Sequence, residues 1–355
     1  MSVRIMTVVG ARPQFIKAAA VSRAVAARDD IIEIMVHTGQ HFDDNMSKVF
    51  FDELDIPPPA YSLDIHGGSH GDMTGRMLSA LEAVMGKEHP DWVMVYGDTN
   101  STLAGALAAA KLNFPVAHVE AGLRSFNRRM PEEINRVVAD HLSTLLFCPT
   151  VQSVINLERE GITAGVHHAG DVMYDATVFA AVRARERSTI LENLRLAPGG
   201  YSLATIHRAE NTDDPKQLRA VMDWLSNKAK ERPIVFPVHP RTRDALARAD
   251  IVPQGVAMID PVGYLDMARL LDGAVAVYTD SGGLQKEAYF HRKPCVTLRA
   301  ETEWTELVEC GWNRLWTDPD YGPRKEVTEY GDGDAAGRIL DDIARHDVGT
   351  ARRHS

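Results

Sequence analysis

The sequence predicts an α/β protein with two Rossmann-like domains and a central cleft between them. Short apolar runs of strand type alternate with helical segments, which is the pattern of a doubly wound parallel sheet. The alternation then restarts in the second half of the chain. At 355 residues the chain is also too long for one ordinary hydrophobic core. These three observations together favour two sheets over one.

The first half contains five apolar runs with five helical segments between them. The predicted strands are Val3–Val9, Ile31–His37, Trp92–Tyr96, Phe114–Val119 and Leu145–Cys148. The predicted helices are Pro13–Ala27, Asp44–Leu54, Ser69–Met85, Ser101–Leu112 and Glu133–Ser143. We therefore expect a first domain over residues 1–170.

The second half repeats the alternation with a new set of strands. These are Tyr201–Ile206, Pro233–Val238, Val256–Ile259, Ala274–Tyr278 and Cys295–Leu298. The join lies near Gly170, where a long helix is predicted to run toward Leu194 until Pro198 and two glycines end it. We expect a second domain over residues 171–340, followed by a helix end and tail over 341–355.

Composition limits the classes of function. Hydrophobic residues make up 45% and charged residues 25%, as in a globular protein, and the net charge of −10 argues against nucleic acid or an anionic membrane as partner. No run approaches the ~20 apolar residues of a membrane span. Three widely spaced cysteines favour neither a disulfide framework nor a zinc site and fit a reducing cytoplasm. No ligand spacing predicts a metal, and no motif requires a cofactor.

Three carboxylates fall within one short stretch of the first domain. Asp98 and Glu120 each follow a predicted strand, and Glu132 opens the next helix. Open parallel sheets bind ligands at the carboxyl ends of their strands. Crowded carboxylates repel one another, which predicts that at least one pKa is pushed toward neutrality, as general acid–base catalysis requires. The stretch is therefore predicted to form half of an active site.

Basic and polar residues follow the first two strands. Arg12 and Lys17 lie at the start of the first helix, where Pro13 suits the first helical position. We expect both cations to face the cleft. Gln40 and His41, after the second strand, are weaker candidates.

A second half-site is predicted in the second domain. Ser281, Gly282 and Gly283 form a small-residue turn before a helix, whose free N–H groups favour a phosphate. Glu287, six residues after Ser281, would accept hydrogen bonds from ribose hydroxyls. His207 and His239 follow two other strands, where a protonated imidazole would stabilise a diphosphate leaving group.

Eight ordered motifs make the chain resemble the non-hydrolysing UDP-N-acetylglucosamine 2-epimerase family nearly end to end. In the first domain they are Gly-Ala-Arg12-Pro-Gln-Phe-Ile-Lys17, Thr-Gly-Gln40-His41, Gly-Asp98-Thr, His-Val-Glu120-Ala-Gly-Leu-Arg and Pro-Glu132-Glu-Ile-Asn-Arg. In the second they are His207-Arg-x-Glu-Asn, Pro-Val-His239-Pro and Thr-Asp-Ser281-Gly-Gly-Leu-Gln-x-Glu287.

The resemblance implies the glycosyltransferase-B architecture, a homodimer and a UDP-sugar substrate. The implied reaction inverts C2 without NAD or metal, by anti elimination of UDP to a 2-acetamidoglucal followed by re-addition. The implied catalytic residues are Asp98, Glu120, Glu132 and His207. Residues implied to bind substrate or UDP are Arg12, Lys17, His239, Ser281, Gly282, Gly283, Glu287 and Arg299. Which carboxylate is the base does not follow from the sequence.

Departures from the family pattern concern the substrate. Many N-acetylglucosamine epimerases have Thr and Glu where this chain has Ala11 and Gln14. The Ala11 and Gln14 version and the C-terminal Glu301-Thr-Glu-Trp304 version look more like the branch acting on UDP-2,3-diacetamido-2,3-dideoxy-glucuronic acid. A sugar carboxylate would need an extra cation, for which Arg299 and Arg124 are candidates.

Two alternatives of the same architecture stay open, and so does one question of regulation. The first alternative is a glycosyltransferase, against which the acidic balance and the three carboxylates count. The second is a hydrolysing epimerase, which differs only in whether the glycal and UDP stay bound until they recombine. Some family members are activated by their own substrate, and Gln40, His41 and Arg208 are the candidate residues for such regulation here.

Overall fold

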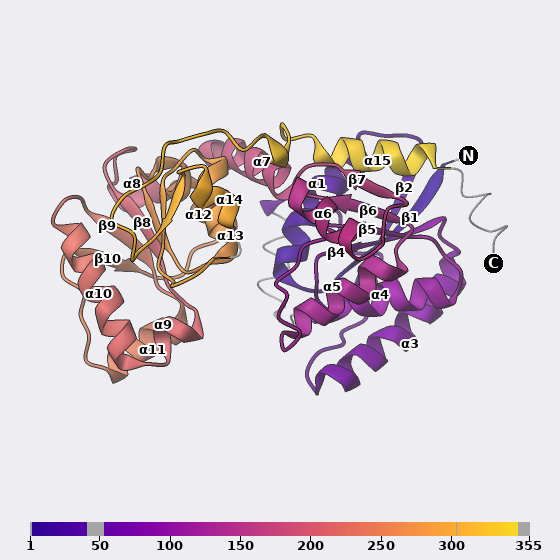
Figure 1. Cartoon of the computed structure of the whole chain (residues 1–355), viewed down its shortest axis with the longest axis horizontal. Helices are drawn as coiled ribbons and strands as arrows, with labels where there is room; N and C mark the ends of the chain where they lie inside the picture. The colour runs from indigo at the N-terminus through magenta and orange to yellow at the C-terminus, as the bar shows by residue number, and fades with distance from the viewer. Residues whose placement is uncertain (1, 41–52, 303, 347–355) are drawn as a thin grey trace. The chain divides into compact units, whose positions relative to one another are not determined.

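The computed structural model describes residues 2–40, 53–302 and 304–346. The chain divides into two compact units, which Figure 1 shows in ribbon form: unit 1 comprises Met1–Ala176 and Thr328–Ser355, and unit 2 comprises Thr177–Val327. Each unit is an α/β structure built on its own parallel sheet, which confirms the predicted fold class of two Rossmann-like units.

Unit 1 holds a seven-stranded parallel sheet in the order β3-β2-β1-β4-β5-β6-β7. Its strands are β1 (Val3–Val9), β2 (Ile31–His37), β3 (Tyr61–Ser62), β4 (Trp92–Tyr96), β5 (Val116–Val119), β6 (Leu145–Cys148) and β7 (Val166–His168). The helices are α1 (Arg12–Ala26), α3 (His70–Glu88), α4 (Asn100–Lys111), α5 (Pro131–Leu142), α6 (Val151–Arg159), the start of α7 (Val172–Arg187) and α15 (Ala335–Arg345). A short 3-10 helix, η1 (Thr328–Tyr330), precedes α15.

Unit 2 holds a six-stranded parallel sheet in the order β10-β9-β8-β11-β12-β13. Its strands are β8 (Ser202–Thr205), β9 (Ile234–Pro237), β10 (Val256–Ile259), β11 (Val277–Thr279), β12 (Cys295–Thr297) and β13 (Asn313–Leu315). The helices are α8 (Ile190–Asn193), α9 (Ala209–Thr212), α10 (Pro215–Ala229), α11 (Pro240–Arg248), α12 (Tyr264–Gly273), α13 (Gly282–Phe290) and α14 (Thr305–Glu309).

The strand order reverses once in each sheet, between β1 and β4 in unit 1 and between β8 and β11 in unit 2. Connections on the two sides of such a switch point leave in opposite directions, which opens a crevice at the carboxyl ends of the strands. Of the predicted site residues, Arg12 follows β1, Asp98 follows β4, His207 follows β8 and Ser281 follows β11. The fold therefore provides one ligand-binding edge in each unit.

The predicted helix toward Leu194 is broken in the structure. Helix α7 ends at Arg187 and the short α8 begins at Ile190. Ser188 Oγ donates to Asp266 Oδ1 at 2.5 Å and accepts from the Ile190 N–H at 3.3 Å. Serine side chains that bond nearby backbone groups compete with the helix, which explains the break.

The end of the chain returns to unit 1, whereas the sequence-based boundary placed the second domain as far as residue 340. Helix α15 packs on α1, and Ile339, Leu340 and Ile343 are buried. Asp175 of α7 accepts from the N–H groups of Ala335 and Ala336 at 3.2 and 2.8 Å. An amphipathic helix shows in its sequence that it packs, but not which sheet it covers.

Gln14 fixes the turn from β1 into α1. Its side chain is 1% exposed; Oε1 accepts from the N–H groups of Gly10 and Ala11 at 2.9 and 3.0 Å, and Nε2 donates to Tyr96 O at 2.8 Å. The first two bonds satisfy free N–H groups at the helix start. The third ties α1 to the end of β4.

Gln14→Ala is expected to lower the free energy of unfolding by roughly 2–4 kcal/mol, because it leaves several buried polar groups without partners. Chemical denaturation measures this loss. Gln152→Ala, at an exposed position on α6, is the matched control and should change stability by less than about 0.5 kcal/mol. Equal stabilities of the two variants would contradict the role given to Gln14.

Candidate active site

The three predicted carboxylates all lie at one edge of unit 1. Asp98 follows β4, Glu120 follows β5, and Glu132 is in the first turn of α5. Asp98 and Glu132 line a pocket of about 190 Å³. Its lining residues are Ala11, Pro13, Gln14, Lys17, Gln40, His70, Gly97, Asp98, Thr99, Asn100, Pro131, Glu132 and Asn135.

Two of the three carboxylates form ion pairs with cationic side chains, whereas the sequence predicted that the carboxylates repel one another. Lys17, in the pocket wall, forms an ion pair with Glu120, and Arg136 of α5 forms one with Asp98. An adjacent cation favours the ionised form of a carboxylate. The sequence-based picture of three crowded acids therefore changes, because each of these two has a neutralising partner.

Glu120 adopts a left-handed backbone conformation with φ of +72°. Non-glycine residues rarely occupy this region, and strain of this kind gathers at functional sites. Two bonds to Phe147 O, from the N–H groups of Glu120 and Ala121 at 3.1 Å each, hold the turn in place. The conformation directs the Glu120 side chain toward Lys17.

Glu132 and its neighbour Glu133 have different environments. Glu132 is exposed in the pocket, and its carboxylate has no hydrogen bond or ion pair within the described part of the chain. Glu133 is buried and accepts from Ser125, Phe126 and Arg136. Burial would raise the pKa of Glu133, but these donors outweigh it and the pKa is lowered. Glu133 thus shapes the loop and holds Arg136 for Asp98.

The remaining candidate residues of unit 1 differ in whether they line the pocket. Lys17 and Gln40 line the pocket, and Gln40 Oε1 accepts from the N–H and hydroxyl of Ser101 at 3.1 and 2.9 Å. Arg12 is exposed and is not among the lining residues. His41 lies outside the described residues.

In unit 2, His207 lies in the turn between β8 and α9, and its side chain is 45% exposed. Asp280, at the end of β11, is fully buried behind it. The Asp280 carboxylate accepts from the backbone N–H groups of His207 and Arg208 at 3.1 and 3.0 Å and from Asn211 Nδ2 at 3.0 Å. Asp280 Oδ1 is also 3.4 Å from His207 Nδ1. The carboxylate therefore fixes the turn and places a negative charge next to the histidine ring.

His239 lies near His207, with 6.3 Å between the ring centroids. It is the N-cap of α11, and its Nδ1 accepts from the Arg241 N–H at 3.3 Å. Since Nδ1 accepts, the neutral ring carries its hydrogen on Nε2, which is then a donor. His239 thus has a structural role as a cap and a second ring nitrogen suited to an anion.

The Ser281 turn forms as predicted. Ser281 caps α13 by accepting from the Leu284 N–H at 3.4 Å, and Gly282 and Gly283 open the helix. A Cβ added at Gly283 would meet nothing within 4 Å, so space lies open there. Glu287 is half-buried on the same helix. The arrangement fits a phosphate at a helix N-terminus.

The two candidate cations for a sugar carboxylate differ. The Arg124 side chain is 1% exposed and is engaged by both Asp140 and Glu160, each at 2.7 Å. Both ion pairs already neutralise Arg124, which weighs against it as a partner for a sugar carboxylate. Arg299 follows β12, and its Nε is 3.5 Å from Glu210 Oε2. Arg299 remains a candidate.

Sequence reasoning did not assign roles to Arg136 or Asp280. Arg136 stands four residues after Glu132, a helical spacing that indicates a shared face. No signal marked Asp280, because an acid before Ser-Gly-Gly reads equally well as part of the turn. In the described ranges, no group of three or more His, Cys, Asp or Glu side chains could hold a metal ion. None of the described helices is long and apolar enough to cross a membrane.

Fold and pocket together define the class of this protein: a two-unit α/β protein of the glycosyltransferase-B type with an acid-lined pocket in unit 1. The family model described as UDP-N-acetylglucosamine 2-epimerase matches residues 23–344. The chain belongs to the UDP-N-acetylglucosamine 2-epimerase family.

Individual relatives agree with this placement. The chain is 55% identical over 316 residues to UDP-2,3-diacetamido-2,3-dideoxy-D-glucuronate 2-epimerase of Pseudomonas aeruginosa, covering 88% of each chain. It is 42% identical over 328 residues to UDP-N-acetylglucosamine 2-epimerase of Methanococcus maripaludis, covering 89% of each. The crystal structure of the Methanocaldococcus jannaschii epimerase in complex with UDP-GlcNAc and UDP matches with a TM-score of 0.82 and 38% identity, covering 98% of this chain and all of that one.

Proposed function

We propose that this protein is a non-hydrolysing UDP-sugar 2-epimerase that inverts C2 of a UDP-2-acetamido sugar. The observation that carries the proposal is the unit 1 pocket, which Asp98, Glu132 and Lys17 line and where Lys17 pairs with Glu120. A pocket that gathers carboxylates with matched cations suits proton transfer at carbon. A glycosyltransferase has no need of several such acids.

The reaction takes place in two steps. A carboxylate removes the proton from C2 while the C1–O bond breaks, and the electron pair of the C2–H bond forms the C1–C2 double bond of a 2-acetamidoglucal. UDP leaves with the electrons of the C1–O bond. A second acid then delivers a proton to the opposite face of C2, and UDP re-adds at C1. We assign proton handling to Asp98, Glu120 and Glu132.

We assign UDP to the unit 2 strand ends. The α13 N-terminus at Ser281, Gly282 and Gly283 would bind the phosphates, and Glu287 the ribose hydroxyls. His207 and His239 would donate to the diphosphate. We assign Arg12 and Lys17 of unit 1 to substrate binding.

Two substrates are candidates for this chemistry. UDP-N-acetylglucosamine, interconverted with UDP-N-acetylmannosamine, is the substrate named in the family description. UDP-2,3-diacetamido-2,3-dideoxy-glucuronic acid is favoured by the Pseudomonas relative at 55% identity. Its carboxylate would need a cation, which we assign to Arg299.

A substrate comparison tests the proposal. Each nucleotide sugar is incubated with the protein without an acceptor, and the C1 and C2 proton signals are followed by NMR. Appearance of the C2 epimer, with the UDP linkage intact, supports the proposal and identifies the substrate. Free sugar and UDP would instead indicate a hydrolysing enzyme, and turnover only with an added acceptor would indicate a glycosyltransferase.

UDP binding is expected to be accompanied by net proton uptake at about pH 7.5. Burial lowers the pKa of the His207 ring; the charge of Asp280 opposes this effect, and His239 and Arg208 act in the same direction as burial. The free ring is therefore neutral at this pH, and a bound diphosphate raises its pKa so that it gains a proton. Titration calorimetry in buffers of different ionisation enthalpy measures the uptake. Equal uptake by His207→Asn would contradict the assignment.

We further propose that the protein is a homodimer located in the cytoplasm. We also propose that residues 1–170 form the catalytic domain and that most of residues 171–340 form the UDP-binding domain. Cys148, Cys295 and Cys310 are buried free thiols, as in proteins of reducing compartments. We also propose that any activation by substrate would involve Gln40, His41 and Arg208. Sedimentation equilibrium decides between monomer and dimer.

A further inference from the structure

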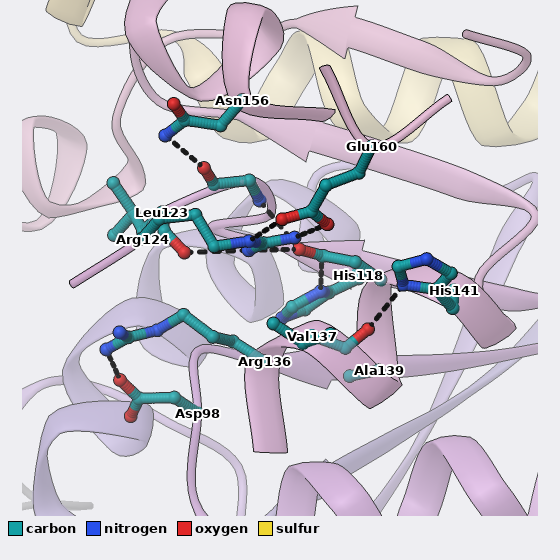
Figure 2. Close-up of polar contacts among 12 residues, drawn as sticks. Asp98, His118, Leu123, Arg124, Arg136, Val137, Ala139, His141, Asn156 and Glu160 are labelled. Atoms are coloured by element: carbon teal, nitrogen blue, oxygen red, sulfur yellow. Dashed lines mark hydrogen bonds and ion pairs between the residues drawn. The ribbon is translucent and has the colours of Figure 1, made fainter. Parts of the chain in front are cut away.

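Figure 2 shows a network of charged side chains in unit 1, in which His118, Arg124 and Glu160 are labelled. His118 on β5 is at its centre, two residues before Glu120, and its side chain is 0% exposed. His118 Nδ1 is 2.7 Å from Asp140 Oδ1, and Nε2 is 2.8 Å from Gly97 O. Neither the motif comparison nor the proposed reaction gives His118 or Asp140 a role.

Both ring nitrogens of His118 face hydrogen-bond acceptors. A carboxylate oxygen and a backbone carbonyl can only accept, so both nitrogens must carry hydrogen. A histidine ring with two N–H groups is positively charged. The geometry thus indicates a buried imidazolium.

The surrounding charges balance this cation. The other oxygen of Asp140 accepts from Arg124 at 2.7 Å and from the Gly122 N–H at 3.1 Å, and Arg124 donates to both oxygens of Glu160. Two cations and two anions result, which avoids an unpaired buried charge. Burial alone would raise the pKa of Asp140, but the charges and hydrogen bonds of His118 and Arg124 lower it.

The network joins the three segments that carry the carboxylates. Gly97, which accepts from His118, precedes Asp98. Gly122, which donates to Asp140, stands two residues after Glu120. Asp140 itself lies on α5, which begins with Glu132 in its first turn.

The backbone of these segments needs such support. Gly97, Glu120 and Gly122 have φ values of +59°, +72° and +77°. A Cβ at Gly122 would lie 2.4 Å from Ser153 O, so this turn is packed tightly against α6. Glycine adopts this region freely, but a non-glycine residue such as Glu120 keeps it only where surrounding contacts enforce it.

We propose that His118 is a buried imidazolium which, with Asp140, acts as a positioning residue for Asp98, Glu120 and Glu132. The proposal rests on the proposed epimerase function for its kinetic consequence. Its structural part, the charge state of the ring, does not depend on the reaction.

The first test is spectroscopic and uses the wild-type chain. A ¹H–¹⁵N correlation spectrum of the histidine rings should show protons on both nitrogens of His118, exchanging slowly with water. In Asp140→Asn the ring should lose one of these protons, because its counter-charge is gone. A single ring N–H in the wild type would overturn the proposal.

The second test is kinetic. His118→Asn and Asp140→Asn should each lower kcat about 10-fold or more while KM and UDP affinity change less than about 3-fold. The double variant should lose little more than either single variant, because the two residues act as a unit. His141→Asn is the matched control: His141 lies on α5 one residue from Asp140 and is exposed, and among the described residues its ring bonds Val137 O of its own helix at 2.8 Å.

The possible outcomes test the positioning role of His118, the charge state of its ring and the proposed function separately. A folded His118→Asn with wild-type kcat would refute the positioning role, as would an equal loss in His141→Asn. If the wild-type chain epimerises no UDP-sugar, the proposed function is refuted. The ring spectra would still decide the charge state of His118. Counting the protons on the His118 ring nitrogens requires only the wild-type protein. This test therefore stays decisive even if a variant fails to fold.

Discussion

Glu120→Gln and Asp98→Asn are each expected to lower kcat about 10²-fold or more while leaving UDP affinity within about 3-fold of the wild type. Both substitutions keep the shape of the side chain and remove its ability to take or give a proton. The amide oxygen introduced at each position can still accept from Lys17 or Arg136, so the local geometry is nearly preserved. UDP is assigned to unit 2, which neither substitution touches. Steady-state kinetics and calorimetric UDP binding measure the two effects.

Glu158→Gln is the control, because Glu158 is an exposed glutamate on α6 of the same unit. Its kcat should stay within about 2-fold of the wild type. Thermal unfolding of all three variants should show folded proteins. If Glu120→Gln and Asp98→Asn lose kcat only in proportion to their loss of folded protein, the carboxylates are structural and the account is wrong.

Asp280→Asn is expected to cause the second large effect, a fall in kcat of about 10²-fold or more. Asp280 is fully buried, and its carboxylate bonds the His207 and Arg208 N–H groups. It also faces His207 Nδ1 at 3.4 Å, which favours hydrogen on that nitrogen. An amide in its place would present an N–H group to one of these donors. His207 would then lose both its orientation and the negative charge that stabilises its protonated form.

The free energy of unfolding of Asp280→Asn should fall by about 1–3 kcal/mol, because one buried donor is left without an acceptor. The pH dependence of kcat separates the two effects, since a purely structural loss would leave its shape unchanged. Asp260→Asn is the control, because Asp260 is exposed and, in the part of the chain that the structure describes, pairs with Arg243 at 2.8 Å. An unaltered pH profile in Asp280→Asn would contradict the role of Asp280 toward His207.

The central strands and helices followed from the sequence because each is a continuous apolar run or an amphipathic stretch. Strand β4, for example, is buried at every position and was predicted to the residue. Strands β3, β7 and β13 were missed, because they have only two or three residues each and β3 and β7 are partly exposed. Such short edge strands leave almost no pattern to detect. The return of α15 to unit 1 is a tertiary preference that no local pattern encodes.

The sequence predicted the part of the candidate site that residue types at the ends of strands reveal. Parallel strands bring their carboxyl ends to one edge, so Asp98 and Glu120 were expected together. Their pairing with Arg136 and Lys17 depends on how α5 and α1 cross that edge, which spacing alone does not determine. His118 lies among apolar neighbours on β5, and only its contacts with Asp140 and Gly97 distinguish it from an ordinary core histidine.

The network of matched charges changes how the acids are understood. Lys17 and Arg136 hold Glu120 and Asp98 before substrate arrives, and the His118–Asp140 pair fixes the turns on which they stand. Preorganised groups of this kind lower the reorganisation needed during reaction. Both sets of charged residues would serve the same step, which is proton transfer at C2 of the sugar.

Incorporation of solvent deuterium at C2 is the most direct measurement of that step. The protein is incubated in D₂O with each candidate UDP-2-acetamido sugar, no acceptor is added, and the C2 proton is followed by NMR. We expect the C2 signal to disappear during turnover and deuterium to be found in both epimers, and we expect Glu120→Gln to slow the exchange about 10²-fold or more. Epimer formation in which the original C2 proton is fully retained would contradict this expectation.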